Sequence, residues 1–418
     1  MYRVSGQLVR ISSRVGVLVV SGAVALSASC SSSVSPAGGA GGSGTPGSGG
    51  SVATGAGGST RGTGGSGNPA GGATGTGGAA TGSGGAATGA GGATGSGGAT
   101  GTGGAASALW RCPAGTFTPL ANTSALATPQ RLAGAPPADN YAQGFSIIEG
   151  PVWLGDALYV SQILGGTPPP PSRILKIVPG SPATVFASND GTNGLAILPD
   201  GDLVGAIHID GSVCRVPIAN PNGLIPIAYF FDTGRFNAPN DLAVRSDGNI
   251  YFSDPDANQA PSPHPQTKTR VYRISPLPAA TVSVVDETLS EPNGVTLSLD
   301  EGTLYVSGPG LYKYPVLADG SVGARLPAVA NPAMYTNSDG MVIDCAGDLY
   351  VAQNQGNDQS VAVINPAGVE VGRINVAGVQ AVTNVAFGGA DHRTLFITTL
   401  DGTPGVFTVP MPLPGMPY

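Results

Sequence analysis

One short unit occurs six times in this chain and limits what the chain can fold into. Its clearest copy, Asn240-Asp-Leu-Ala-Val-Arg-Ser-Asp-Gly-Asn-Ile-Tyr-Phe-Ser253, has a polar residue, an apolar run, an Asp-Gly turn and a second apolar run. Two short apolar runs separated by such a turn predict a β-hairpin. The polar residues that open the six copies are Glu149, Asn193, Asn240, Asn293, Asp339 and Asn384.

The spacing of the copies predicts the architecture. Equivalent apolar residues of the second run are 45, 47, 54, 45 and 46 residues apart: Leu158, Leu203, Ile250, Leu304, Leu349 and Leu395. A period in the mid-forties with strand signals alone fits the four-stranded blades of a propeller. Six copies therefore predict an all-β fold, a six-bladed β-propeller that occupies residues 107–418.

The first 30 residues have the features of an export signal. Three arginines precede an apolar stretch, Val15–Leu26, and small residues and Cys30 follow it. Such a stretch is too short to span a membrane and is typical of a cleaved signal. The residues before Cys30 resemble an imperfect bacterial lipoprotein box, which predicts lipidation of Cys30. Ordinary signal cleavage near Ala28 is the alternative.

Residues 31–106 consist almost entirely of Gly, Ala, Ser and Thr. Such a segment has no apolar side chains to offset the entropy of ordering, so the sequence predicts a disordered linker. Together, the two N-terminal segments predict an exported protein of the periplasm or cell surface. We expect its contact with the outer membrane to be limited to the lipid anchor.

The acidic charge balance of the chain argues against some classes of binding partner. The chain has 25 acidic and 18 basic residues, and three of the basic ones fall in the export signal. An acidic domain without a basic cluster is a poor candidate for binding nucleic acid or acidic lipid. We therefore expect a small-molecule partner, and nothing in the sequence suggests more than a monomer.

Three cysteines remain after the signal, in a chain predicted to enter an oxidising compartment. Blade geometry would place Cys214 and Cys345 on opposite faces. We therefore expect Cys112 to form a disulfide with Cys345, which leaves Cys214 as an odd, buried cysteine.

The six opening residues predict chemistry as well as structure. The first strand of every propeller blade runs along the central channel, so equivalent residues of six such strands form a ring. Two carboxylates and four amides would meet there. Oxygen ligands of this kind fit Ca²⁺, with Mg²⁺ or Mn²⁺ as alternatives. Zn²⁺ is less favoured, because the three histidines are scattered. For any one of these residues, capping of a strand is the structural alternative.

Five motifs in the repeats resemble those of the senescence marker protein-30, gluconolactonase and luciferin-regenerating enzyme family. They are Glu149-Gly-Pro-Val-Trp153, Pro239-Asn240-Asp241, Pro292-Asn293-Gly294, Ser338-Asp339-Gly340-Met341 and Thr383-Asn384-Val-Ala-Phe-Gly-Gly389. The resemblance implies a six-bladed propeller with a central divalent metal that hydrolyses sugar lactones or related esters. It also implies four metal ligands: Glu149, Asn240, Asn293 and Asp339.

Substrate contacts follow in part from the same resemblance. Asn193 matches an Asn-Gly-Leu motif of the bacterial lactonases. The animal lactonase has a substrate-binding arginine at the position of Ala238, so its sugar preference does not carry over. We expect Asn193, His208 and Asn384 to contact the substrate. The imidazole of His208 would assist proton transfer there, and the alternative is a rim histidine that is hydrogen-bonded to a loop.

The residues predict a metal-assisted mechanism. The ion would polarise the lactone carbonyl, and Asp339 would activate water. Glu149 is the second candidate for the base. No Gly-x-Ser-x-Gly motif is present to support a serine nucleophile. Two alternatives stay open: a non-catalytic propeller stabilised by calcium that binds a ligand or protein, and a phosphotriester or ester hydrolase that uses the same metal.

Overall fold

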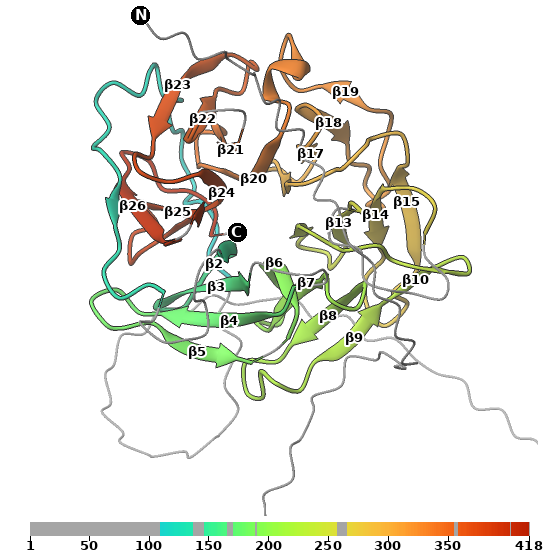
Figure 1. Ribbon diagram of the computed structural model, residues 1–418. Coiled ribbons are helices and arrows are strands. Elements are labelled where there is room, and N and C mark those ends of the chain that lie inside the picture. Colours follow the sequence, from blue (N-terminus) through green and yellow to red (C-terminus); the bar gives the residue numbers. More distant parts are fainter. Residues whose placement is uncertain are drawn as a thin grey trace, which may run out of the picture. The chain divides into compact units, whose positions relative to one another are not determined.

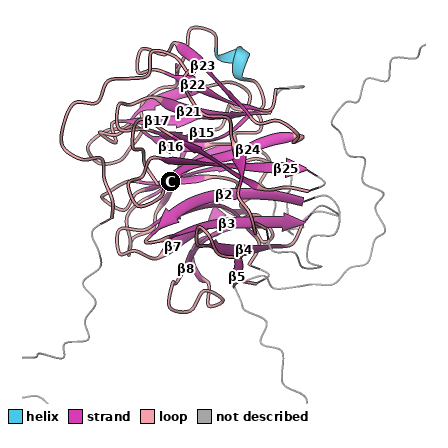
Figure 2. Ribbon diagram, turned by 90° about the vertical axis from the view of Figure 1, so that its left-hand side faces the viewer, coloured by secondary structure: helices cyan, strands magenta, loops and turns pink. Residues whose placement is uncertain are grey.

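The computed structural model describes residues 109–136, 146–164, 170–188, 190–256, 266–354, 358–401 and 403–417. Regular structure in these ranges is almost entirely β-strand, and the exception is a short 3₁₀ helix, η1 (Pro332–Tyr335) (Figure 2). No helix of the described part has the length and apolar character needed to cross a membrane. The all-β prediction is confirmed. The predicted export signal and linker lie outside the described residues.

Four sheets contain four antiparallel strands each, joined in chain order. The first is β6 (Thr192–Ile197), β7 (Leu203–Ile207), β8 (Ser212–Val216) and β9 (Ile225–Ala228). The second is β12 (Leu242–Val244), β13 (Ile250–Asp254), β14 (Arg270–Ile274) and β15 (Val282–Asp286). The third is β16 (Val295–Leu297), β17 (Thr303–Val306), β18 (Tyr312–Pro315) and β19 (Leu326–Pro327). The fourth is β20 (Ser338–Ile343), β21 (Leu349–Gln353), β22 (Ser360–Ile364) and β23 (Glu370–Asn375).

The first and last repeats share one eight-stranded sheet. Its first half is β2 (Ser146–Leu154), β3 (Ala157–Leu164), β4 (Ser172–Ile177) and β5 (Thr184–Ala187). Its second half is β24 (Ala381–Gly388), β25 (Thr394–Asp401), β26 (Val406–Pro410) and the N-terminal strand β1 (Gln130–Arg131). The halves are joined where β2 pairs with β25. The last repeat is thereby attached directly to the first.

Each recurring unit of the sequence folds as the predicted hairpin. The hairpins are β2–β3, β6–β7, β12–β13, β16–β17, β20–β21 and β24–β25. In the third hairpin Gly248 of the Asp-Gly turn has a φ of 89°, a conformation that glycine adopts at least cost. Figure 1 shows the hairpins side by side around a common centre, with β2, β6, β20 and β24 among the strands nearest to it.

Apolar side chains fill the space between neighbouring sheets. In one cluster Val204 of β7 packs with Phe236, Phe252 and Tyr272, and the rings of Phe252 and Tyr272 stack with centroids 5.2 Å apart. Four other clusters likewise combine residues of adjacent sheets, and a fifth packs the two halves of the eight-stranded sheet together. Burial of these side chains supplies the main driving force for the fold and holds the inner strands in fixed positions. A two-stranded hairpin, β10 (Phe230–Phe231) and β11 (Gly234–Arg235), lies between β9 and β12.

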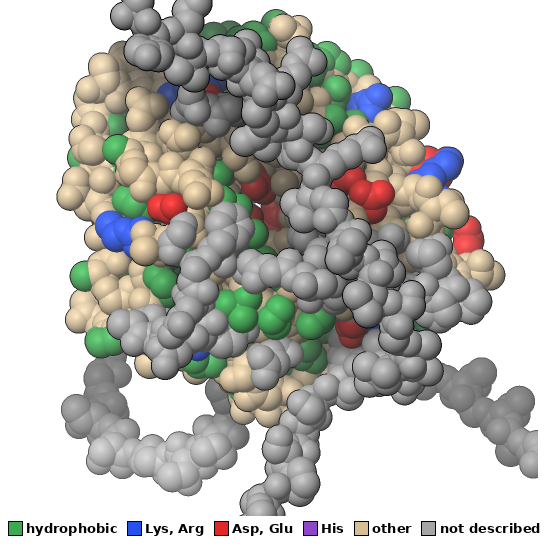
Figure 3. Space-filling model, in the orientation of Figure 1, with side chains coloured by type: hydrophobic (Ala, Val, Ile, Leu, Met, Phe, Trp, Pro, Cys, Tyr) green, Lys and Arg blue, Asp and Glu red, His purple; other side chains and the backbone are tan. Residues whose placement is uncertain are grey.

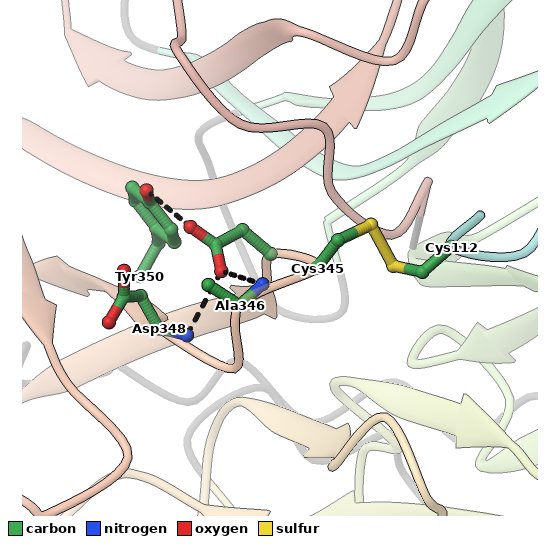
Figure 4. The surroundings of a disulfide bond; sticks show 6 residues. Cys112, Cys345, Ala346, Asp348 and Tyr350 are labelled. Carbon is green, nitrogen blue, oxygen red and sulfur yellow. Dashed lines mark hydrogen bonds between the residues drawn. A yellow bond between two sulfur atoms is a disulfide. The ribbon is translucent and has the colours of Figure 1, made fainter. Parts of the chain in front are cut away.

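Both ends of the described chain contact the last residues of inner strands. Cys112 forms a disulfide with Cys345, directly beyond the end of β20 (Figure 4). The Met416 N–H donates to the Ile343 carbonyl oxygen at 2.9 Å. The predicted Cys112–Cys345 disulfide is confirmed. Cys214 is fully buried as expected, but the described part contains no free thiol, so the expectation of an odd cysteine is wrong.

Candidate metal centre and active site

The opening polar residues of the six hairpins stand where the inner strands begin. Four lie within strands, in β2, β6, β20 and β24, and two lie two residues before the first residues of β12 and β16. In those four strands the pairing register shifts beside the polar residue. Such a bulge turns side chains out of the regular alternation. We call this set the polar ring: Glu149, Asn193, Asn240, Asn293, Asp339 and Asn384.

Glycines directly after the ring positions let neighbouring backbones approach closely. The four that share this role are Gly150, Gly194, Gly294 and Gly340. A Cβ at Gly340 would lie 1.9 Å from the side-chain amide of Asn384, and one at Gly150 would lie 2.3 Å from the carbonyl oxygen of Asn193. No side chain fits in either place. The spacing of the ring therefore depends on residues that bear no side chain.

Hydrogen bonds connect the second, third and fourth hairpins at the ring. The N–H of Gly194 donates to the carbonyl oxygen of Asn240 at 2.6 Å. Oδ2 of Asp241 accepts the N–H of Val295 at 3.0 Å. The backbone of Asn240 is thus bonded to the second hairpin, and the side chain of Asp241 is bonded to the fourth.

Similar bonds join the fourth hairpin to the fifth and the last hairpin to the first. Oγ of Ser307 donates to the carbonyl oxygen of Asp339 at 2.7 Å, which joins the fourth hairpin to the fifth. Nδ2 of Asn384 donates to Oε2 of Glu149 at 3.3 Å, which joins the last hairpin to the first. The same Oε2 accepts the N–H of Gly150 at 3.0 Å. Together with the close approaches of Gly150 to Asn193 and of Gly340 to Asn384, these bonds link all six predicted positions.

Burial governs the electrostatics of the ring. It raises the pKa of Glu149 to about 8, and the nearby charge of Asp241 adds to the shift. Burial likewise raises the pKa of Asp241 to about 7. The pKa of Asp339 is raised well above its usual value by burial first, and then by the charges of Glu149 and Asp241. Figure 3 shows acidic side chains in a hollow at the middle of one face. A cation would favour the ionised form of these carboxyls.

Two amide oxygens of the ring are suited to a cation. Oδ1 of Asn193 and Oδ1 of Asn293 are buried and have no hydrogen-bond partner. The Asn293 side chain does bond to the Asp339 carboxyl, so its unpartnered carbonyl oxygen lies beside a carboxylate. Buried polar atoms without a partner are rare. Because carboxylate and amide oxygens are ligands that Ca²⁺ accepts, the residues present fit a divalent ion.

The carboxylates of the polar ring do not form a metal site by themselves. Among the described residues no group of three or more His, Cys, Asp or Glu side chains is arranged to hold a metal ion. A cation at the polar ring would therefore require the amide oxygens as well. This composition is the one that the sequence predicts, with Glu149 and Asp339 as acids and Asn240 and Asn293 as amides.

His208 is held by a loop and is not bonded to the ring. Its Nε2 lies 2.7 Å from the carbonyl oxygen of Pro170, and its Nδ1 has no partner. The side chain is 1% exposed, and burial lowers its pKa to about 4. His208 is therefore neutral near pH 7. The geometry matches the alternative of a histidine bonded to a loop more closely than that of a proton donor. The predicted lipidation site, Cys30, lies outside the described residues.

Asp241 was not among the predicted site residues, yet it contributes a third buried carboxylate. Both of its oxygens accept backbone N–H groups, from Leu242 at 2.9 Å and from Val295 at 3.0 Å. The signal in the sequence is a departure from the repeat: the third copy has aspartate where four of the others have glycine. An Asn-Asp pair before a strand is common in turns, which is why the pattern alone did not single out Asp241.

Comparisons with known proteins show that the chain is similar to several lactonases. The chain is 27% identical over 294 residues to a gluconolactonase of Zymomonas mobilis, an alignment that covers 63% of this chain and 78% of that one. It is 32% identical over 137 residues to the pentonolactonase XacC of Haloferax volcanii, covering 32% of this chain and 45% of the other. The solved structure of XC5397 from Xanthomonas campestris, described as a gluconolactonase, is 25% identical. It matches with a TM-score of 0.55 over 72% of this chain and 98% of its own.

The family model described as "SMP-30/Gluconolactonase/LRE-like region" matches residues 147–401, which include all six polar-ring positions and more than half of the chain. The chain therefore belongs to the SMP-30/gluconolactonase/LRE-like family.

Proposed function

We propose that this protein is a six-bladed β-propeller that opens sugar lactones with the help of a divalent ion, Ca²⁺ first, held at the polar ring. The observation that carries the proposal is the ring itself. Two buried amide oxygens without partners lie among buried carboxyls whose pKa values are raised by burial and by their mutual repulsion. The enzyme class is that of the named relatives, lactone hydrolases.

The substrate follows from the relatives and from the polar groups of the site. Gluconolactonase and pentonolactonase are named for lactones of simple sugars, and we infer a small sugar lactone here as well. Asn193 and Asn384 are the residues that we assign to substrate contact. Asn193 offers an unpartnered amide oxygen there, whereas His208 is buried and bonded to the Pro170 loop.

Four residues would hold the ion: Glu149, Asn240, Asn293 and Asp339. A divalent ion bound there supplies a Lewis acid for the lactone carbonyl and offsets the charge that develops on its oxygen. The Asp339 carboxylate accepts a proton from the attacking water. The side chain of Asn293 bonds to that carboxyl and fixes its direction. The bonds from Gly150 and Asn384 orient Glu149 in the same way.

The test compares substrates with and without a chelator. The full chain is expected to hydrolyse δ- and γ-lactones of sugars, to lose this activity in EDTA and to recover it with Ca²⁺. Asp339→Asn and Glu149→Gln should abolish turnover in folded protein. Faster hydrolysis of a paraoxon-like ester would favour the phosphotriesterase alternative. Calcium binding without turnover on either substrate would favour a non-catalytic propeller. Full rates in both variants would contradict the assigned site.

We also propose that the protein is exported as a monomer and anchored to the outer membrane through a lipid on Cys30. The Cys112–Cys345 disulfide supports an oxidising compartment. Labelling of cells with a radioactive fatty acid should mark the wild-type protein but not a Cys30→Ala variant. Equal labelling of both proteins would contradict the anchor.

A further inference from the structure

Asp241 occupies a position that most other repeats give to glycine. The residue after the ring position is glycine in the first, second, fourth and fifth repeats. In the third repeat it is Asp241, whose side chain is 6% exposed. Glycine lets the next backbone approach directly, as at Gly194, where a Cβ would lie 2.7 Å from the carbonyl oxygen of Asn240. The third repeat must make the corresponding connection in another way.

The carboxylate of Asp241 supplies that connection. Oδ1 accepts the N–H of Leu242, the first residue of β12, at 2.9 Å. Oδ2 accepts the N–H of Val295, the first residue of β16, at 3.0 Å. One side chain thus joins the first residues of two neighbouring inner strands. Both partners are donors, so the side chain between them must offer two acceptors.

We infer that Asp241 is a positioning residue, which fixes the separation of Asn240 and Asn293 by joining β12 to β16. Asn240 directly precedes Asp241, and Asn293 stands two residues before Val295. Without the carboxylate this connection between the first residues of β12 and β16 would be lost. The inference rests on the proposed function, in which these amides hold the ion.

Two substitutions test whether the connection requires the carboxylate of Asp241. Asp241→Gly installs the residue that the other repeats use, and Asp241→Asn keeps the shape but turns an NH₂ group toward one of the two N–H donors. Asp344→Asn is the matched control. Asp344 is also a buried carboxyl that accepts two backbone N–H groups, from Ala346 at 2.8 Å and Asp348 at 3.0 Å. It lies beyond the opposite end of β20 from Asp339.

Three measurements on the full chain test the inference. Hydrogen–deuterium exchange at the Val295 amide, in metal-free protein, should be faster in both Asp241 variants. Calorimetric titration should show Ca²⁺ affinity about 10- to 100-fold lower, as for other residues that orient metal ligands. Lactone kinetics should show the loss mainly in kcat. Asp241→Asn should lie between wild type and Asp241→Gly. The Asp344→Asn control should keep wild-type values in all three.

Failure of this inference can be distinguished from failure of the proposed function. If Asp241→Gly keeps wild-type protection of Val295, or keeps wild-type Ca²⁺ affinity despite faster exchange, Asp241 does not position the site and the inference is wrong. If the wild type itself neither binds Ca²⁺ nor hydrolyses lactones, the proposed function fails. In that case Val295 exchange still decides whether the carboxylate joins the two strands.

Discussion

A methyl group at position 340 would collide with the polar ring. The added Cβ would lie 1.9 Å from the amide of Asn384, whose Nδ2 donates to Glu149. Either Asn384 or β20 must move, because the side chain has no free space. We expect Gly340→Ala to lower the free energy of unfolding by about 1–3 kcal/mol, as overpacking does. It should also abolish lactone hydrolysis. Urea denaturation and initial rates measure the two effects.

Gly323→Ala is the control for that substitution. A Cβ there would lie 3.5 Å from Pro315, an ordinary contact distance. Stability and rate should stay close to those of the wild type. A Gly340→Ala protein with full activity would mean that Asn384 and Glu149 tolerate displacement, which contradicts the role of the ring.

Asp344 predicts a pH dependence of stability. Burial raises its pKa to about 7, and the charge of Asp348 adds to the shift. The folded state therefore favours the protonated carboxyl. This contribution to stability is complete below about pH 4 and is lost as pH rises through about 7. The amide introduced by Asp344→Asn mimics the protonated carboxyl and still offers an oxygen to the N–H of Ala346. This variant should therefore be more stable than the wild type at pH 8, with the difference vanishing near pH 4.

Asp300 should affect the pH dependence of stability in the opposite direction. Hydrogen bonds from the Ser298 hydroxyl and the Gly302 N–H lower its pKa, so the ionised form is favoured in the folded state. Asp300→Asn should be less stable than the wild type above about pH 4, and equal to it at lower pH. Urea titrations of both variants across this range measure the differences. A difference of the same sign for both would exclude local pKa shifts as the cause.

The strand β20 connects the site to the chain ends. Asp339 stands near its start, and the Cys112–Cys345 disulfide lies beyond its end. Asp348, three residues after Cys345, accepts the N–H of Leu120 at 2.6 Å, so a hydrogen bond as well as the disulfide attaches the N-terminal segment here. Removal of the disulfide by Cys112→Ala with Cys345→Ala should cost about 2–4 kcal/mol. Lactone hydrolysis should persist, because the inner strands hold Asp339 independently.

Urea denaturation with and without dithiothreitol checks this expectation. The reductant should destabilise the wild type more than the double variant, which lacks the Cys112–Cys345 disulfide. Proteolysis should cleave the segment near Leu109 more readily in the variant. A fall in kcat that follows the loss of stability would instead mean that the chain ends hold the site in shape.

The hairpins were predictable because their signals are local. The unit at Asn240 contains both apolar runs and its turn within fourteen residues. The pairing of β1 with β26 was not predictable in this way. Gln130 and Arg131 are exposed, show no alternation, and pair with Thr408 and Phe407 near the opposite end of the chain. Strands that short carry too little pattern to identify a partner at that separation.

The residues of the candidate site also differ in whether the sequence alone could predict them. The six ring positions could be predicted because the repeat places them in register, and their contacts follow from that register. The role of Asp241 could not be predicted, because its partner Val295 is 54 residues away. The hydrogen-bond partner of His208 is Pro170, in a connection outside the repeat. Repetition therefore identifies what the six hairpins share, whereas the features particular to one repeat require the structure.

The polar ring draws on residues from 149 to 384, so it forms only when all six hairpins are assembled. An ion that binds the ring must therefore stabilise the whole fold. At a Ca²⁺ concentration 100 times its Kd, the free energy of unfolding should rise by about 2.7 kcal/mol relative to EDTA. Glu149→Gln should lose most of this gain. Since burial raises the pKa of Glu149 to about 8, the neutral side chain should cost the metal-free protein little.

Glu370→Gln controls for general effects of charge, since Glu370 pairs with Arg373 at 2.7 Å on β23, the last strand of its sheet. That variant should keep the full gain from Ca²⁺. An equal gain in the wild type and Glu149→Gln would place the ion elsewhere. Because an ion bound anywhere on the folded protein raises the free energy of unfolding, the variants locate the site. A gain that Glu149→Gln abolishes and Glu370→Gln preserves would place the ion at the ring.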